Sequence, residues 1–187
     1  MKTIIKKFIH LIIGEYAPYL IFGRNCKQEI NAPTSGVAPG FRELDTETLE
    51  SINSAFVQEQ RWYGGTETNC FAYVHDGEIA GLCFYWHGER YKTRNFWPLK
   101  TGEAKLVQII VSPEMRGRGI ASKLIAFSAD EMARKGFDRL YARIWHSNDP
   151  SIKAFEHAGW QRIAFVLEIN PFRSNRPIRL QKRIAPI

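Results

Sequence analysis

The chain has 187 residues, of which 44% are apolar and 13% aromatic, which is enough to build a core and excludes a wholly disordered protein. Its formal net charge of +7 does not by itself distinguish a nucleic-acid or membrane partner from a small polyanionic ligand. Cys26, Cys70 and Cys83 are odd in number and form no CxxC pair, which argues against a disulfide framework or a zinc knuckle. We therefore expect a reduced, cytoplasmic setting.

The first segment, MKTIIKKFIHLIIGEY, carries apolar side chains at helical spacing, with Lys2, Lys6 and His10 on another face. This pattern predicts an amphipathic helix over residues 1–16 that packs on the protein body or on a second subunit, as in a homodimer. The alternative is a peripheral contact with the inner membrane surface, because a basic amphipathic helix binds anionic lipid. A secretory signal is not expected, since no small-x-small cleavage site follows before Glu15.

Residues 31–40, NAPTSGVAPG, have the composition of a linker. We therefore expect an N-terminal extension over residues 1–39, formed by the amphipathic helix and this linker, and one folded domain over residues 40–187. The order of predicted strands and helices over residues 40–187 is that of a single α/β domain with a mixed sheet. The expected elements are strands at 41–44, 70–75, 78–86, 104–111, 139–145, 160–169 and 178–183, and helices from 45 to about 62, from about 117 to 135, and after Asp149-Pro150.

The segment VQIIVSPEMRGRGIASKLI places a strand, a glycine-containing turn and a helix in succession. A helix N-terminus presents unpaired N–H groups and the positive end of the helix dipole, so it binds anions. Gly117 and Gly119 allow close approach of a phosphate, and Arg116 and Arg118 add positive charge. The segment is not a P-loop, because GxxxxGK[ST] is absent, and Ser122 stands at the third position of the Rossmann fingerprint.

The motif RGRGIA, residues 116–121, resembles the [RQ]-x-x-G-x-[GA] acyl-CoA loop of GNAT N-acetyltransferases. The preceding Ile109–Pro113 fits that family's I-x-V-x-P register. A second stretch, from Asn148 to Trp160, is similar to the family's N-x-x-A-x-x-x-Y-x-x-x-G-F motif. The resemblance covers about residues 40–170 and implies a GNAT-like acyl-CoA transferase fold, with acetyl-CoA as cosubstrate and no metal.

The resemblance also implies where acetyl-CoA would bind. The central strand would diverge from its neighbour, and its freed backbone groups would hydrogen-bond the pantetheine arm, with the N–H near Ile109 polarising the thioester carbonyl as an oxyanion-hole donor. The pyrophosphate would lie on the glycine-containing turn, and Asn148 would lie beside the pantetheine. The implied cofactor-binding residues are Ile109, Ile110, Val111, Arg116, Gly117, Arg118, Gly119, Ile120, Ala121, Ser122 and Asn148.

Two positions depart from the family pattern. Lys105 stands where the family often has a glutamate general base, and Phe155 stands where its usual tyrosine protonates the leaving thiolate. The expected catalytic residues are therefore His146, an imidazole with an ordinary pKa of about 6.5 at the end of the strand 139–145, and Glu103, which shares strand parity with Lys105 and would act through water. The alternative for His146 is an ordinary loop histidine, and the alternative for Glu103 is a solvated salt-bridge partner.

The loop HGERYKTRNFWPLKTGE combines aromatic and cationic side chains, as an acceptor-binding lid for an acidic or nucleotide-linked substrate would. A solvated loop with its aromatic rings in the core is the alternative. We predict an acetyl-CoA-dependent N-acetyltransferase that moves an acetyl group to a primary amine of a small-molecule acceptor by direct transfer. The alternative is a non-catalytic basic binding module for a membrane surface or nucleic acid, although a nucleic-acid partner is not expected. The five histidines show no metal-ligand spacing.

Overall fold

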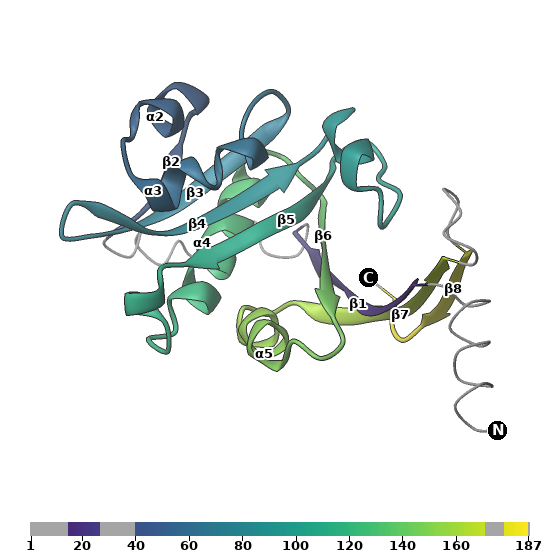
Figure 1. Cartoon of the computed structure of the whole chain (residues 1–187). Coiled ribbons are helices and arrows are strands. Elements are labelled where there is room, and N and C mark those ends of the chain that lie inside the picture. The colour runs from purple at the N-terminus through teal and green to yellow at the C-terminus, as the bar shows by residue number, and fades with distance from the viewer. Residues whose placement is uncertain (1–14, 27–39, 171–177, 187) are drawn as a thin grey trace.

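A computed structural model describes residues 15–26, 40–170 and 178–186 (Figure 1). Eight strands form one mixed sheet in the order β2-β3-β4-β5-β6-β1-β7-β8, which confirms the predicted mixed α/β fold. In chain order the elements are β1 (Glu15–Asn25), β2 (Phe41–Leu44), α2 (Thr46–Ser51), α3 (Ala55–Gln58), the 3-10 turn η1 (Arg61–Tyr63), β3 (Thr68–His75), β4 (Glu78–Trp86), η2 (Arg90–Arg94), β5 (Glu103–Val111), η3 (Pro113–Met115), α4 (Ile120–Arg134), β6 (Arg139–Trp145), α5 (Asp149–His157), β7 (Gln161–Asn170) and β8 (Ile178–Arg183).

Strand β1 lies inside the sheet, antiparallel to both β6 and β7, although the sequence predicted no strand before residue 41. Its residues Tyr19, Ile21 and Phe22 are fully buried. A strand that is covered on both faces reads as a continuous apolar run without the alternation that marks a half-buried strand, and for that reason the pattern was missed. The sheet thus includes residues that precede the predicted boundary at 39/40.

The predicted N-terminal helix falls largely on residues 1–14, which lie outside the described residues. Its last two residues, Glu15 and Tyr16, belong to β1, so the prediction was wrong at that end. Among the helices in the described parts of the chain, none has the length and apolar character needed to span a bilayer.

The single helix predicted from residue 45 to about 62 is instead divided into α2, α3 and η1. The Asp45 side chain caps α2 by accepting a hydrogen bond from the Thr48 N–H at 2.7 Å. The helix ends because Ile52 adopts an extended conformation. The Arg61 guanidinium then donates to the carbonyl oxygen of Ile52 at 3.0 Å, which satisfies an acceptor left free where the helix stops.

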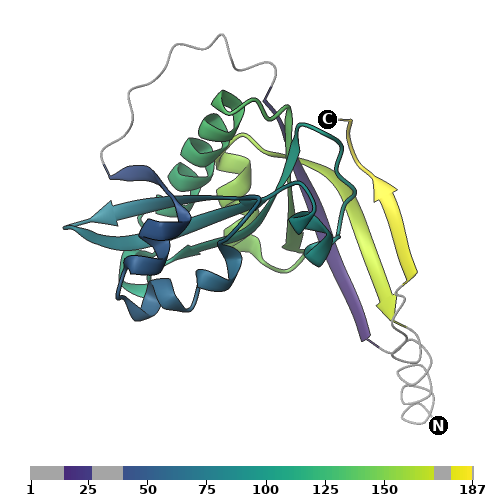
Figure 2. The same ribbon diagram turned by 90° about the horizontal axis from the view of Figure 1, so that it is seen from above.

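The helices cover opposite faces of the sheet (Figure 2). Leu124, Ile125 and Met132 of α4 pack on one face in the main core cluster. Leu49 of α2 and Val57 of α3 pack on the other face, against β3 and β4. Because neighbouring strand residues point to opposite faces, each of these two strands contributes to both cores.

Strands β5 and β6 are parallel neighbours that separate before they end (Figure 1). Their pairing runs only from Glu103 opposite Arg139 to Leu106 opposite Ala142, whereas β5 continues to residue 111 and β6 to residue 145. The unpaired halves of the two strands form the walls of a cleft, which positions the site described next.

Candidate functional site

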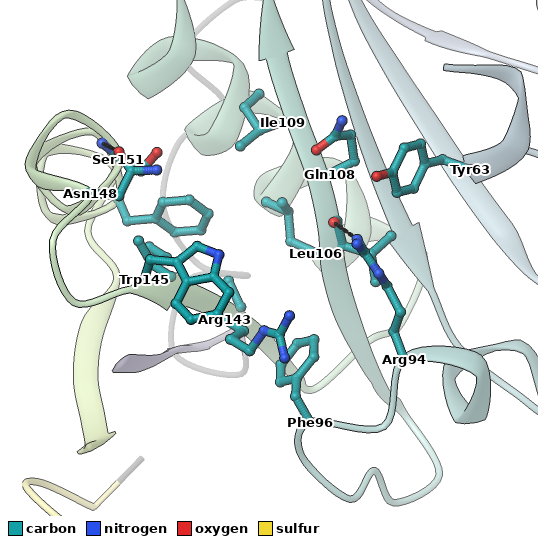
Figure 3. A pocket seen from close by; sticks show the side chains of 14 residues that line it. Tyr63, Arg94, Phe96, Leu106, Gln108, Ile109, Arg143, Trp145, Asn148 and Ser151 are labelled. Atoms are coloured by element: carbon teal, nitrogen blue, oxygen red, sulfur yellow. Dashed lines mark hydrogen bonds between the residues drawn. The ribbon is translucent and has the colours of Figure 1, made fainter. Parts of the chain in front are cut away.

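A cavity of about 230 Å³, here called the β5–β6 cavity, opens between the separated ends of these strands (Figure 3). Helix α5 closes one end of it, and the segment after η2 contributes to the opposite wall. Its lining residues are Tyr63, Arg94, Phe96, Leu106, Val107, Gln108, Ile109, Ala142, Arg143, Ile144, Trp145, Asn148, Ser151 and Phe155.

A second cavity of about 170 Å³, the α4–α5 cavity, lies along the end of β5 between the starts of the two helices. Ile109, Ser151 and Phe155 line both cavities, so the two adjoin. The other residues that line the α4–α5 cavity are Ile110, Val111, Arg116, Ala121, Ile125, Pro150 and Ala154. A ligand in one cavity would therefore meet a ligand in the other at Ile109 and Phe155.

The end of β5 turns free backbone groups toward the cleft. The Ser112 N–H donates to the carbonyl oxygen of Ala80 at the start of β4, at 2.9 Å. Residues of the opposite parity, Ile109 and Val111, therefore direct their N–H and C=O groups toward the other side, where β6 no longer pairs. The Arg116 Nε confirms this direction, since it donates to the Val111 carbonyl oxygen at 3.1 Å. The N–H groups of Ile109 and Val111 are thus presented to the cleft.

Helix α4 begins beside these groups with an open N-terminus. Gly117 and Gly119 adopt left-handed backbone conformations, with φ of 77° and 73°, which glycine tolerates best. No described atom lies within 4 Å of where a Cβ would stand at either position. No side chain caps the helix, so its first N–H groups face outward. The two left-handed glycines also explain why the helix starts at Ile120 rather than at the predicted residue 117.

The structure brings part of the predicted acyl-CoA site together in the α4–α5 cavity. Ile109, Ile110, Val111, Arg116 and Ala121 line this cavity. The other members of the predicted set lie around it: Gly117, Arg118 and Gly119 form an exposed turn, Ser122 is half-buried on α4, Ile120 is buried against Val111 and Met115, and Asn148 lines the β5–β6 cavity.

Asn148 also has a structural role, because its side-chain oxygen accepts a hydrogen bond from the Ser151 N–H at 3.3 Å and so caps α5. The motif residue that sequence analysis placed beside a ligand therefore fixes the start of the helix that closes the cleft.

The two predicted catalytic residues are not brought together. His146 is exposed just after β6, and its backbone N–H donates to the Pro18 carbonyl oxygen at 3.3 Å. Glu103 is buried at the opposite end of β5, where it accepts hydrogen bonds from the Tyr141 hydroxyl at 3.1 Å and the Lys100 N–H at 2.8 Å. Neither residue lines the two cavities.

Lys105 is completely buried on β5. Its Nζ donates to the carbonyl oxygen of Arg94 at 3.3 Å and to Asn95 Oδ1 at 3.2 Å, and it lies 4.7 Å from the centre of the Phe96 ring. Burial lowers the pKa of Lys105 to about 7, and the positive charge of Arg179 contributes to the same shift. Lys105 thus supports the segment that carries two residues of the cavity lining.

Phe155 is 2% exposed and lies between the two cavities. Its ring packs 5.7 Å from that of Phe22 and 5.1 Å from that of Trp160, measured between centroids. A phenylalanine has no hydroxyl proton, so Phe155 cannot protonate a leaving thiolate as the tyrosine of the family pattern would.

Several residues of the β5–β6 cavity were not singled out from the sequence. Arg143 and Trp145 are two residues apart on β6, so they lie on the same face of the strand. This spacing does not reveal which part of the protein that face contacts. Arg94 and Phe96 belong to the loop that was predicted to form a lid. The other residues not singled out there are Tyr63, Leu106, Val107, Gln108, Ala142, Ile144 and Ser151.

Comparison with solved structures shows the same fold. An acetyltransferase of the GNAT family from Colwellia psychrerythraea has 21% identity and a TM-score of 0.59, over 84% of this chain and 57% of that one. A GNAT-family protein from Novosphingobium aromaticivorans has 19% identity and a TM-score of 0.59, over 83% of this chain and 64% of that one. A tandem GNAT protein from the clavulanic acid biosynthesis pathway has 11% identity and a TM-score of 0.55, over 100% of this chain and 59% of that one.

This chain thus spans between 57% and 64% of the length of these three proteins. No curated protein sequence matches it. The family model described as the acetyltransferase (GNAT) family matches residues 38–160, which is more than half of the chain. With the separated strands, the glycine turn and this match taken together, the chain belongs to the GNAT acetyltransferase family.

Proposed function

We propose that this chain is an acetyl-CoA-dependent N-acetyltransferase that transfers the acetyl group directly to a primary amine of a small-molecule acceptor. The observation that carries the proposal is the free backbone edge of β5 at Ile109 and Val111, which opens on the α4–α5 cavity beside the uncapped start of α4. Acetyl-CoA supplies an acetyl group that is activated as a thioester.

The residues present fit acetyl-CoA. The N–H groups at the start of α4 and the left-handed Gly119 would hold the pyrophosphate, since no side chain occupies that space. The N–H and C=O groups on the cleft side of β5 would pair with the amides of the pantetheine arm. Arg118, exposed on the turn, would add charge for the phosphates.

Ile109 would act on the reacting carbonyl. Its N–H lies where the two cavities adjoin and would donate to the thioester oxygen as negative charge develops there. The amine nitrogen forms the new bond to the acetyl carbon, the carbon–sulfur bond breaks, and the thiol sulfur leaves with the electron pair. Phe155 cannot protonate this sulfur, but a thiol of pKa about 8.5 can leave without an acid or take its proton from water.

His146 would take the proton that the amine must lose. The imidazole is exposed next to Trp145, which lines the β5–β6 cavity, so a water molecule could connect it with the acceptor. Only the neutral amine is nucleophilic, and an imidazole is well matched to accept a proton near neutral pH. Glu103 is held at the far end of β5, so His146 is the base of this proposal.

The proposal is tested by free-thiol release from acetyl-CoA in the presence of amino sugars, nucleotide-linked amino sugars, amino acids, peptides and aminoglycosides, with the N-acetylated product identified by mass spectrometry. Amine-dependent thiol release with matching product is the expected result. Binding of acetyl-CoA with no transfer to any of these amines would contradict the enzymatic function and favour a non-catalytic binding module.

A further inference from the structure

The β5–β6 cavity carries positive charge on two opposite walls. Arg143 projects from β6, and Arg94 projects from the end of η2 on the β5 side (Figure 3). Of the described residues that line this cavity, none has a carboxylate side chain. The cavity adjoins Ile109, where the acetyl group would be transferred, so the two guanidinium groups face the place of the acceptor.

The Arg143 guanidinium contacts aromatic rings and leaves its donors free. Its central carbon lies 5.1 Å from the centre of the Tyr19 ring, 5.6 Å from that of Trp145 and 5.8 Å from that of Phe96. Within the described ranges it makes no ion pair and no hydrogen bond through its side chain. Flanking aromatic rings restrict a guanidinium without using its N–H groups, which suits it to bind a ligand.

Arg94 is held in a similar way. Its Nη1 donates to the carbonyl oxygen of Val107 at 3.1 Å, and its central carbon lies 5.5 Å from the Tyr63 ring and 5.8 Å from the Trp62 ring. Among the residues with described positions, no carboxylate pairs with it. The guanidinium is therefore oriented by one backbone contact, while its other N–H groups have no described partner.

Among the described residues, no carboxylate of the cavity lining balances the charge of the two arginines. Lys105 does not line the cavity, but its Nζ lies 4.7 Å from the centre of the Phe96 ring. The hydrogen-bond partners of Lys105 are also a carbonyl and an amide oxygen rather than a carboxylate. Glu168 on β7 is already bound to Arg179 at 2.7 Å, and it accepts from the Tyr19 hydroxyl at 3.3 Å. An acceptor with only a cationic amine would be repelled by such a cavity, whereas one that also carries an anionic group would be attracted.

We propose that the acceptor amine also bears an acidic group, a carboxylate or a phosphate, which Arg94 and Arg143 bind in the β5–β6 cavity. This inference rests on the proposed function. Guanidinium groups match the planar carboxylate and the phosphate oxygens with paired hydrogen bonds. The same positive potential lowers the pKa of the acceptor ammonium, which increases the neutral fraction that can attack the thioester. One pair of arginines would thus select the acceptor and assist its deprotonation.

The test compares matched acceptors in the free-thiol assay. One arm pairs L-amino acids with their primary amides, and the other pairs aminoalkyl phosphates with the corresponding amino alcohols, so the two arms distinguish a carboxylate from a phosphate. An amino-acid amide has more neutral amine at a given pH than the amino acid, so a preference for the acid cannot come from amine availability. We expect one acidic class to be used with a kcat/KM about ten- to a hundredfold higher than its neutral partner, the scale of hydrogen bonds to charged groups.

The variants Arg143→Gln and Arg94→Gln should bring this ratio toward one, and Arg143→Lys should restore part of it. The control Arg134→Gln removes an exposed guanidinium at the far end of α4, which pairs with Glu131, and should leave the ratio unchanged. Equal use of acids and their neutral partners by the wild type, or an unchanged ratio in both variants, would overturn the anion site while the proposed function stands. Stabilisation by acetyl-CoA without transfer to any acid of the panel would also overturn it, whereas no stabilisation by acetyl-CoA would instead overturn the proposed function.

Discussion

Lys105 places a buried amine at a position where the family often has a glutamate. The side chain is fully buried, and its partners are a backbone carbonyl, an amide oxygen and two aromatic rings. A buried ammonium without a carboxylate is costly, which is why the pKa of Lys105 falls to about 7. It stands where the resemblance suggested a base, yet it does not line the cavity, and it supports the segment that carries Arg94 and Phe96.

The lowered pKa of Lys105 predicts a pH dependence of stability. Between about pH 7 and the ordinary pKa of 10.5 the unfolded chain binds a proton at this site that the folded chain does not, so the contribution of Lys105 to stability rises with pH there. At pH 6 the folded protein must keep the charge buried. Lys105→Met should therefore raise the free energy of unfolding, relative to the wild type, by about 2 to 3 kcal/mol more at pH 6 than at pH 9.

Urea unfolding of both proteins at these two pH values measures this difference. The variant Lys153→Met, at an exposed lysine on α5, serves as the control and should show no such difference. A Lys105→Met effect of the same size at both pH values would contradict the buried, weakly basic state of Lys105.

The role of His146 makes a second prediction at this scale. His146→Ala should lower kcat/KM by about ten- to a thousandfold, the range of general-base catalysis, and should change the pH profile of the rate. The affinity for acetyl-CoA should stay near that of the wild type. His157→Ala, at another exposed histidine, is the matched control. Full activity of His146→Ala with an unchanged pH profile would place the base elsewhere.

The sequence predicted which residues gather at the α4–α5 cavity better than which residues gather at the β5–β6 cavity. The glycine turn and the end of β5 are contiguous, so their spacing alone brings Val111, Arg116 and Ala121 to one cavity. The β5–β6 cavity is assembled from η1, the end of η2 and the segment after it, β5, β6 and α5. Arg94 and Arg143 line the same cavity only because the strands separate, and their spacing in the chain gives no sign of that separation.

At the scale of elements, β1 is the largest addition to the predicted fold. It pairs with β6 and β7 and thereby joins the last two strands to the rest of the sheet. Pro18 lies opposite Leu167 of β7, and the pairing with β6 begins only at Tyr19. Proline has no N–H to donate, so at Pro18 the link to the end of β6 is a single hydrogen bond, which the Pro18 carbonyl oxygen accepts from the His146 N–H.

This position of β1 predicts a large effect of truncation in it. Ile21→Ala removes a fully buried side chain and should lower the free energy of unfolding by about 2 to 5 kcal/mol. Ile178→Ala makes the same change on β8, where the side chain is 53% exposed, and should lower the free energy of unfolding by less than about 0.5 kcal/mol. Chemical denaturation compares the two. Equal effects would contradict the placement of residues 15–25 inside the sheet.

The turn between β3 and β4 was predicted more reliably than the extent of the helix that begins after Asp45. The hairpin around Asp76-Gly77 was recognised because a positive φ is needed at both residues, 49° and 82° in the structure, and this dipeptide supplies it. The long helix predicted to begin at Asp45 failed beyond its cap, because apolar spacing does not reveal where a chain leaves the helical conformation.

At the scale of the whole molecule, the alternative of a membrane-surface helix over residues 1–16 predicts a contact with anionic membranes. The full-length protein should co-sediment with vesicles that contain anionic lipid and should be released at high salt. Removal of residues 1–14, which leaves β1 intact, should abolish the binding. Equal sedimentation with and without these residues would leave packing on the protein, or on a second copy, as their role.

The central claim is that β5 and the start of α4 hold acetyl-CoA, and thermal unfolding with and without acetyl-CoA tests it most directly. At a hundredfold excess over the dissociation constant, the wild type should be stabilised by about 2.7 kcal/mol. Gly119→Glu should lose this response, because a carboxylate would stand where the pyrophosphate binds. Gly136→Glu makes the same change just beyond the other end of α4, at a glycine with a similar left-handed conformation and equally open space, and should keep the response. A wild type without a response, or a Gly119→Glu variant that responds like the wild type, would contradict the account.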